Sequence, residues 1–218
     1  MAIITVEHNK RIYCERHGYD LHVKTGWFKY QNIGFEKIFS VLELLKTNKY
    51  EWVFWCGSDT MITNQTIKLE TFVDEGFHFI VSKDVWDINA DVFLARNSLE
   101  CKTFLQRVLD EHDNFVDLYG NPKPSGETLP DGGRKDWSEQ GAIIKLLQEY
   151  EGIIKILPQK SFNAYLYHLY TSPWHQKGMD ANGNDGRWGE GDFLVHWPGL
   201  PYTTRVQLAV QFIKLVKE

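Results

Sequence analysis

Cysteine is scarce in this 218-residue sequence, which has only three. They are Cys14, Cys56 and Cys101, which are scattered along the chain without CxxC spacing and cannot all pair. A secreted disulfide framework and a zinc knuckle both need more, or more closely spaced, cysteines. The sequence therefore favours a protein of a reducing compartment in which the thiols serve as small core residues.

Long apolar runs are also missing. The first ten residues, MAIITVEHNK, hold only a short apolar run before charge appears. No stretch approaches the ~18 apolar residues that a membrane-spanning helix needs. We therefore expect a soluble, unexported chain located in the cytoplasm, with no membrane segment.

Positive charge is the third deficit. The 24 Lys and Arg are outnumbered by 29 Asp and Glu, which gives a formal net charge of −5, and there is no long basic run. This excludes the electrostatic footprint of a dedicated nucleic-acid binder, so an anionic ligand would need a local site. At 43% hydrophobic and 14% aromatic content, the chain can bury one large core, and we expect a single domain over residues 1–218.

Strand-like and helix-like segments alternate along the chain. The expected strands are AIITV, DLHV, EWVFWC (buried on both faces), FHFIVS, DVFLAR and GIIKILP. The expected helices are HNKRIYCERHG ended by Gly18, a helix from Phe35, a helix capped by Asn97 that runs to about His112, and one in DWSEQGAIIKLLQEYEG. This order predicts an α/β fold with a central, mostly parallel sheet flanked by helices. Ligands of such folds gather at the carboxyl ends of strands.

Two polar residues follow strand-like runs at such ends. Asp59 comes directly after EWVFWC, and His196 lies near the end of the run in GDFLVHWPG. Carboxylate and imidazole together suit Mn²⁺ or a similar divalent ion. Either residue alone has an ordinary alternative, because aspartate is a common turn residue and histidine is often a hydrogen-bonded, partly buried residue.

Six segments, in order, resemble glycosyltransferase family thirty-four. They are HNKRIYCERHGYDLHV, the helix containing Lys37, YEWVFWCGSDTMITN, INADVFLARNS, DWSEQGAI and GDFLVHWPG. The resemblance implies the GT-A (Rossmann-like) fold and the transfer of galactosyl, mannosyl or xylosyl groups, as in the fungal and plant members. The chain is also similar to stand-alone sugar transferases encoded by large algal viruses.

The resemblance carries over to a metal motif. The family's Asp-Ser-Asp falls on Gly57, Ser58 and Asp59. It implies that Asp59 and His196 bind Mn²⁺ or Mg²⁺, which grips the diphosphate of a nucleoside-diphosphate sugar, and that Ser58, Asp59 and Gly199 contact this donor. Because Gly57 stands where the family has aspartate, we expect weakened donor binding. Gly57→Asp should then restore affinity, unless the backbone at this position needs the positive φ that glycine tolerates.

Catalytic roles are also implied by the resemblance. Gln140 matches a glutamine set against the reacting face of the sugar. Glu139 is either a reactive group or, with Asp136, a helix cap. Asp91 stands where the family usually has glycine, and it is either a sugar contact or a turn residue at the start of a strand.

Other donor contacts follow from the same blocks. Thr5, Glu7 and Lys37 are expected to contact the nucleotide. Arg96 and Asn97 are possible sugar contacts, although Asn97 is also a helix-cap candidate. After Gly199, where the family tends to carry a basic residue, this chain has Leu200 and Pro201. Either Arg205 compensates, or the metal neutralises the diphosphate largely alone.

The glycine-rich stretch at 176–191 is expected to be a mobile lid over the donor. Three aromatic residues in or beside it, Trp174, His175 and Trp188, are candidates for stacking on sugar rings, with ordinary core packing as the alternative.

These features predict a metal-dependent, retaining glycosyltransferase. It would move a sugar from a nucleoside-diphosphate sugar, uridine rather than guanosine, to a carbohydrate or glycoprotein acceptor. The alternatives are a carbohydrate-binding module whose catalysis was lost with the change to Gly57, and a metal-dependent hydrolase of nucleotide sugars.

Overall fold

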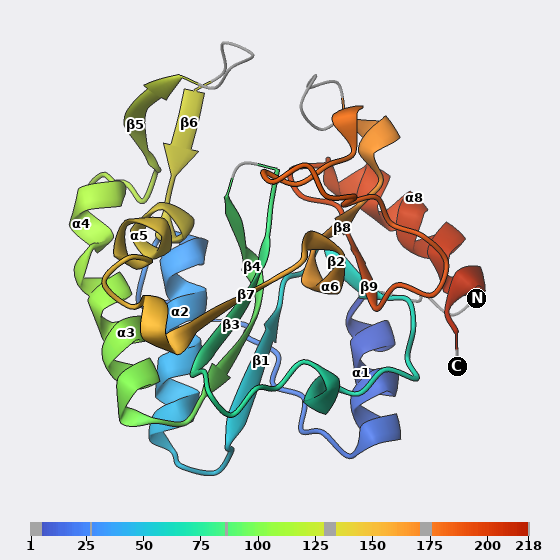
Figure 1. The fold of residues 1–218 in the computed structure, drawn as a ribbon, viewed down its shortest axis with the longest axis horizontal. Coiled ribbons are helices and arrows are strands. Elements are labelled where there is room, and N and C mark those ends of the chain that lie inside the picture. Colours follow the sequence, from blue (N-terminus) through green and yellow to red (C-terminus); the bar gives the residue numbers. More distant parts are fainter. Residues whose placement is uncertain (1–5, 27, 86, 129–133, 171–175, 218) are drawn as a thin grey trace.

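The computed structural model describes residues 6–26, 28–85, 87–128, 134–170 and 176–217. Its α-helices are α1 (Val6–His17), α2 (Ile33–Lys46), α3 (Leu99–Asp110), α4 (His112–Phe115), α5 (Glu139–Leu146), α6 (Gln159–Phe162) and α8 (Tyr202–Phe212) (Figure 1). Its strands are β1 (Trp52–Cys56), β2 (Thr60–Ile62), β3 (Phe79–Lys83), β4 (Ile88–Arg96), β5 (Lys123–Thr128), β6 (Arg134–Trp137), β7 (Ile154–Leu157), β8 (Ala164–Tyr165) and β9 (Leu194–His196). Within these ranges no helix is both long and apolar enough to cross a bilayer.

A four-stranded sheet with the order β1-β4-β3-β7 forms the centre. The α/β class is thus confirmed, but the sheet is mixed rather than mostly parallel. Strand β4 runs antiparallel to both β1 and β3, and β3 and β7 form the parallel pair of this sheet. The reason is the link between β3 and β4, residues 84–87, which is too short for the crossover that a parallel pair requires.

Helices α2, α3 and α5 cover one face of this sheet, and α1 lies on the other side (Figure 1). Side chains alternate across the strands accordingly. Phe79 and Val81 of β3 join the core beneath the three helices, whereas Ile80 joins a second core with Tyr13 of α1. The apolar side chains of α2 recur at three and four residues, so one helix face is buried in the first core.

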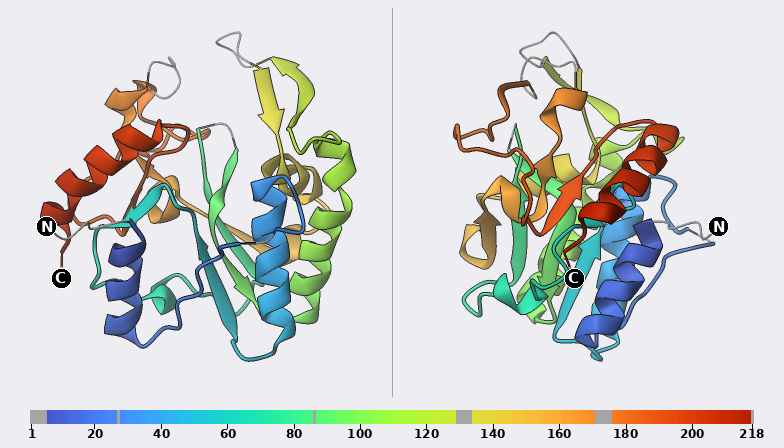
Figure 2. Two further views of the ribbon diagram at one scale, coloured as in Figure 1. Left: turned by 180° about the vertical axis from the view of Figure 1, so that it is seen from behind. Right: turned by 90° about the vertical axis from the view of Figure 1, so that its right-hand side faces the viewer.

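A second, three-stranded sheet with the order β2-β9-β8 packs beside α8 (Figure 2). Met61 and Val195 from this sheet, with Trp197 directly after β9, form a third core with Leu208 and Phe212 of α8. Strand β2 follows β1 after the short turn that contains Asp59 and pairs antiparallel with β9, with Thr60 opposite His196. This pairing brings the two predicted metal ligands together, although they lie far apart in the sequence.

Several sequence-based boundaries need correction. Residues 20–23 (DLHV) form no strand, because this exposed segment finds no neighbouring strand and its Val23 side chain is 43% exposed. Strand β1 is an edge strand and mostly half-buried, so EWVFWC is not buried on both faces. Of AIITV, Val6 begins α1 and the rest lies outside the described residues.

The cap of α3 is Ser98 rather than Asn97. The Ser98 hydroxyl accepts a hydrogen bond from the Cys101 amide at 3.1 Å. The Asn97 side chain is engaged elsewhere, because its amide group donates to the Tyr50 carbonyl at 2.9 Å. The predicted helix also ends earlier than expected, since α3 stops at Asp110 and the short α4 follows.

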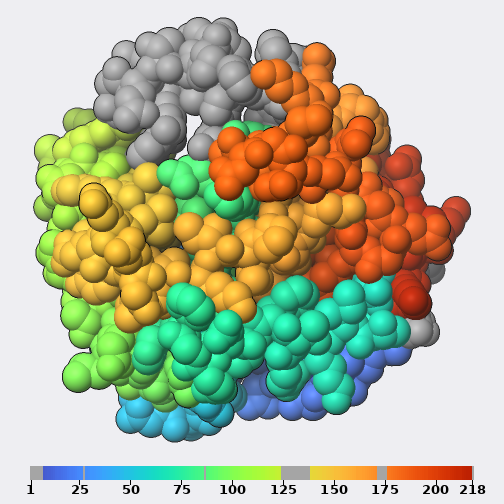
Figure 3. Space-filling view, viewed as in Figure 1, coloured from blue at the N-terminus to red at the C-terminus, as the bar shows by residue number. Residues whose placement is uncertain are grey.

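The segment 176–191 lies at the surface of the molecule (Figure 3), and its last part bonds to the strand β8. Tyr165 donates its amide hydrogen to Gly186 and accepts from the Trp188 amide, at 3.0 and 2.9 Å. The Trp188 indole donates to the Thr63 hydroxyl at 3.1 Å, and its ring packs on Phe212. This favours the core-packing interpretation of Trp188, whereas Trp174 and His175 lie outside the described residues. The lid remains a prediction.

Candidate metal centre

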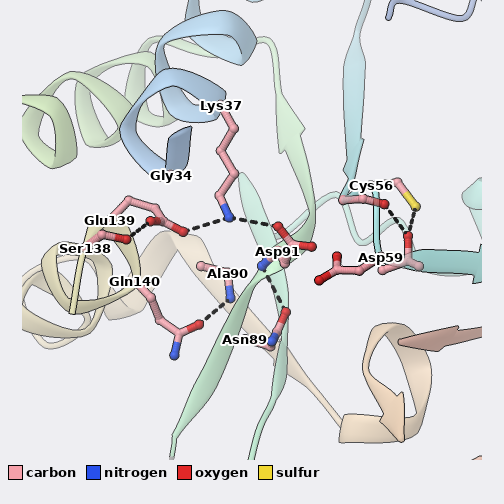
Figure 4. A network of polar contacts seen from close by, with 12 residues as sticks. Gly34, Lys37, Cys56, Asp59, Asn89, Ala90, Asp91, Ser138, Glu139 and Gln140 are labelled. Atoms are coloured by element: carbon pink, nitrogen blue, oxygen red, sulfur yellow. Dashed lines mark hydrogen bonds and ion pairs between the residues drawn. The ribbon is translucent and has the colours of Figure 1, made fainter. Parts of the chain in front are cut away.

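Asp59, Asp91 and His196 meet where β1, β2, β4 and β9 come together. Each offers one ligand atom, and the three atoms lie within 4.8 Å of one another. His196 Nε2 is 3.5 Å from Asp59 Oδ1 and 3.6 Å from Asp91 Oδ2. Figure 4 shows the side chains of Asp59 and Asp91 directed toward one another. Two of these residues were predicted metal ligands, and Asp91 is an addition from β4.

The turn that carries Asp59 is fixed by short-range hydrogen bonds. The Gly57 carbonyl accepts from the Thr60 hydroxyl at 2.7 Å and from the Thr60 amide at 3.3 Å. The Asp59 carbonyl accepts from the Trp197 amide at 2.9 Å, directly after β9. The backbone on both sides of the cluster is therefore held before any ligand binds.

His196 is oriented by Asn163. Its side chain is 1% exposed, and its Nδ1 lies 2.6 Å from Asn163 Oδ1. The Asn163 amide group donates to the Lys83 carbonyl, so Oδ1 is the acceptor and Nδ1 carries the hydrogen. The Nε2 atom then presents a lone pair toward the two carboxylates. It is buried without a hydrogen-bond partner among the described residues. A buried acceptor is costly when left unpaired.

The pKa values of the two carboxylates are shifted in opposite directions. Burial and the neighbouring Asp59 raise the pKa of Asp91 above its ordinary value, even though Lys37 opposes the shift. Burial would also raise the pKa of Asp59, but the charged form of His196 beside it lowers that pKa below its usual range. Two nearby carboxylates in a protected site are stabilised when a cation binds between them.

Lys37 links this cluster to helix α5. Its ammonium group, on a side chain only 6% exposed, lies 3.2 Å from Asp91 Oδ1 and 2.7 Å from Glu139 Oε1. Glu139 also accepts from the Ser138 hydroxyl. Burial would raise the pKa of Glu139, but Lys37 outweighs burial and lowers it. Glu139 is thus a buried partner of Lys37.

The structure bears on the alternatives of a helix cap involving Glu139 and Asp136, and of a strand-start turn at Asp91. Ser138 occupies the N-cap position of α5 without a side-chain cap bond, and the Asp136 side chain lies outside the described residues. Asp91 lies inside β4, which begins at Ile88, so it is not a turn residue at a strand start. Gln140 accepts from the Ala90 amide at 3.0 Å, next to Asp91, and its contact with a sugar remains a prediction.

The predicted donor-binding residues are more dispersed. Ser58 is exposed in the same turn as Asp59, and Gly199 has a φ of +68° in the turn after β9. Lys37 is committed to its two carboxylates. Glu7 lies in the first turn of α1, where its contact among the described residues is with Arg11 at 2.8 Å. Thr5 lies outside the described residues.

Arg96 and Asn97 lie at the end of β4 opposite to Asp91. Five residues of extended strand separate Arg96 from Asp91, which corresponds to about 16 Å. Arg96 pairs there with Glu51 and Glu75, and Asn97 bonds to the backbone of residue 50. The sugar contact considered for these two residues remains a prediction, and it would need a sugar that extends this far from the cluster.

Three other residues contact the cluster or its backbone. Arg205 of α8 places Nη1 3.6 Å from Asp59 Oδ2. Lys10 of α1 donates to the carbonyls of Cys56 and Gly57. Sequence reasoning considered only Arg205, and it missed Lys10 and Asn163. No local pattern marks Asn163, because its partner His196 lies 33 residues away.

The donor set fits a hard divalent cation. Two carboxylates and one neutral imidazole suit Mn²⁺ or Mg²⁺, and three protein ligands leave positions for oxygen atoms of a substrate. Two features would be satisfied together by a bound cation: the close carboxylate pair, and the His196 Nε2 atom that lacks a hydrogen-bond partner within the described part of the chain.

The chain resembles known glycosyltransferases in sequence. Residues 2–75 match the model of the galactosyl transferase GMA12/MNN10 family. An uncharacterized alpha-1,2-galactosyltransferase of Schizosaccharomyces pombe is 24% identical over 225 residues, which cover 89% of this chain. The match spans only 62% of that protein.

Solved structures agree on the fold. A glycosyltransferase involved in the glycosylation of the major capsid of PBCV-1 has a TM-score of 0.64 at 15% identity, with 95% of this chain and 90% of that chain covered. The glycosyltransferase GlyE of Streptococcus pneumoniae TIGR4 has a TM-score of 0.52 at 14% identity, with 96% and 50% covered. The chain therefore has the GT-A glycosyltransferase fold, and the resemblance of its N-terminal part to the galactosyl transferase GMA12/MNN10 family is confirmed.

Proposed function

We propose that this chain is a single-domain, metal-dependent glycosyltransferase that transfers a sugar, with retention, from a uridine diphosphate sugar to a glycan acceptor. The observation that carries the proposal is the buried Nε2 of His196, which has no hydrogen-bond partner among the described residues and faces Asp59 and Asp91 within 3.6 Å. The GT-A fold and the sequence resemblance support the same activity.

Asp59, Asp91 and His196 would hold Mn²⁺ or Mg²⁺. When bound, such an ion supplies Lewis-acid stabilisation to the diphosphate as it leaves the sugar. Asn163 keeps His196 in the tautomer that presents Nε2, and Lys37 holds one oxygen of Asp91. Such supporting contacts fix ligand orientation, and their loss typically weakens metal affinity by ~10- to 100-fold.

Arg205 is suited to contact the diphosphate directly. Its guanidinium lies 3.6 Å from Asp59 and its side chain is 27% exposed, so donors remain accessible beside the cluster. Guanidinium groups bind phosphate oxygens in pairs. Arg205 thereby takes the place of the basic residue expected after Gly199.

Retention is supported by the lack of a free base in the cluster. An inverting enzyme needs a carboxylate that can accept the acceptor's proton. Among the described residues of the cluster, Asp59 and Asp91 would be committed to the cation, and Glu139 is committed to Lys37. In the retaining alternative, the departing phosphate accepts this proton while the acceptor hydroxyl attacks from the same face.

The test is incubation with uridine and guanosine nucleotide sugars, with Mn²⁺ or with a chelator, and without acceptor. We expect slow, Mn²⁺-dependent hydrolysis of a uridine diphosphate sugar that an added glycan acceptor outcompetes. Fast hydrolysis that no acceptor changes would indicate a nucleotide-sugar hydrolase. No turnover with any donor would contradict the proposal and favour a carbohydrate-binding module.

A further inference from the structure

Gly57 and Asp91 occupy facing positions on neighbouring strands. The antiparallel register of β1 and β4 pairs Cys56 with Val92, and the next pair beyond it is Gly57 with Asp91. The Gly57 amide donates to the Asp91 carbonyl at 3.1 Å, which continues the ladder past the end of β1. The two Cα atoms are thus fixed side by side at the edge of the candidate metal centre.

The Asp91 carboxylate fills the space that a side chain at position 57 would occupy. A Cβ atom built on Gly57 would lie 1.6 Å from Asp91 Oδ2 and 2.4 Å from its Cγ. Non-bonded atoms do not approach so closely, so any other residue at position 57 must displace this carboxylate. The backbone itself does not require glycine here, because Gly57 is absent from the glycines with positive φ.

The same carboxylate is held at one oxygen by Lys37, and its other oxygen faces the candidate metal ligand His196. Asp91 Oδ1 lies 3.2 Å from the Lys37 ammonium, and Oδ2 lies 3.6 Å from His196 Nε2. Lys37 is itself fixed by Glu139, whose carboxylate lies over another glycine, Gly34, with a built Cβ 1.6 Å from Oε2. The carboxylate of Asp91 therefore reaches the cluster only because position 57 has no side chain.

We infer that positions 57 and 91 share one carboxylate place in the metal centre, and that Asp91 supplies from β4 the ligand that an aspartate at position 57 would supply from β1. The inference rests on the proposed metal site and adds a specific ligand and a specific coupling to it. The place admits one carboxylate, from either strand but not from both. The inference also reverses the expectation that Gly57→Asp alone restores donor affinity.

If positions 57 and 91 share one place, a substitution at position 57 should have different effects in the native chain and in an Asp91→Gly variant. In the native chain, Gly57→Ala adds no charge but displaces the Asp91 carboxylate, so Mn²⁺ affinity should fall at least fivefold. With Asp91→Gly, the ligand is already absent, and adding Gly57→Ala should change affinity less than twofold. Gly57→Asp alone should weaken binding, whereas Gly57→Asp combined with Asp91→Gly should recover affinity to within about fivefold of the native chain.

Mn²⁺ binding to the full chain can be followed by the electron paramagnetic resonance signal of the free aquo ion, with the melting temperature of each variant as a check on folding. The contact at position 57 is with a side-chain tip, which can rotate away, so we expect the alanine variant to fold. If it does not, the two variants in the Asp91→Gly background still decide the question.

The measurements separate failure of the metal site from failure of the shared carboxylate place. A native chain that binds no Mn²⁺ overturns the metal site and this inference together. Native binding that survives Asp91→Gly, or that the combined Gly57→Asp and Asp91→Gly variant fails to recover, overturns the inference and leaves the metal site of Asp59 and His196 standing.

Discussion

Two regions of the molecule bury carboxylates beside cations, and they differ in how completely their polar atoms are paired. On helix α2, the Glu36 side chain is 1% exposed. One of its oxygens accepts from the amides of Lys29 and Tyr30 at 2.8 and 2.9 Å, and the other pairs with Lys24 at 2.8 Å. Such a carboxylate needs nothing further, and its role is structural.

The candidate metal centre of Asp59, Asp91 and His196 is built differently. It holds two carboxylates within reach of one another, and His196 Nε2 is left without a hydrogen-bond partner among the described residues. An incompletely paired buried group costs free energy that a structural site avoids. Pairing, rather than burial or charge alone, thus separates a candidate ligand site from a structural ion pair in this chain.

The largest expected effect tests the metal centre. Asp59→Ala or His196→Ala removes one of three protein ligands, so Mn²⁺-dependent binding of uridine diphosphate should fall at least a hundredfold, about 2.7 kcal/mol. Calorimetry with and without Mn²⁺ measures it. Asp74→Ala, which removes a carboxylate paired with Lys155 in another part of the molecule, is the matched control and should bind as the native chain does. Unchanged affinity in both site variants would show that the metal site is elsewhere.

The second prediction tests the structural carboxylate. Glu36→Ala leaves the amides of Lys29 and Tyr30 unpaired and removes the partner of Lys24. The free energy of unfolding should fall by ~2 kcal/mol, while Mn²⁺ affinity stays the same. Denaturant unfolding measures the loss. The control is Glu43→Ala on the same helix, whose pair with Lys46 is about half exposed and should contribute less than ~0.5 kcal/mol. Weakened Mn²⁺ binding in the folded Glu36 variant would contradict the purely structural role of Glu36.

The third prediction concerns Asn163, which connects the candidate metal centre to the backbone of β3. Asn163→Ala removes the acceptor of the His196 Nδ1 hydrogen, so His196 can turn or change tautomer. Mn²⁺ affinity should fall by about tenfold, less than after loss of a ligand. Because Asn163 is fully buried and also bonds to the Lys83 carbonyl, the melting temperature should fall as well. Asn163→Asp keeps an acceptor for Nδ1 and should retain more affinity than alanine does. Equal losses in the two variants would contradict the orienting role.

The sequence predicts the elements of this fold better than their pairing. The helices at Phe35 and Glu139 and the strands around Val53 and Val81 follow from apolar periodicity, which is a local property. The antiparallel β3 and β4 pair was missed although the short link at 84–87 pointed to it. Strand DLHV was predicted from composition, but a strand also needs a partner, which no local pattern reveals.

The candidate metal centre was predictable only in part, because some of its contacts depend on the pairing of distant segments. Asp59 and His196 are marked by their places after strand-like runs, and the resemblance assigns both to the metal. Asp91 was noticed as unusual, but its place beside Gly57 depends on the register of β1 and β4. The roles of Asn163 and Lys37 depend on contacts across 33 and 54 residues, respectively, which single-sequence reasoning does not reach.

The smallest expected effect is a pH dependence at the structural carboxylate. Burial alone would raise the pKa of Glu36, but Lys24 and the backbone amides of Tyr30 and Lys29 outweigh burial and lower it. A carboxylate with a lowered folded-state pKa contributes stability above its unfolded-state pKa, and this contribution is lost as the pH falls through the folded-state value. The difference in unfolding free energy between the native chain and Glu36→Gln should therefore be constant from pH 7 to about pH 5 and shrink below about pH 4.3, the ordinary value for glutamate. Urea unfolding at several pH values measures it, with Glu43→Gln as the control on the same helix. A difference that grows on acidification would show that Glu36 is destabilised in the folded state, and the contrast with the metal centre would then fail.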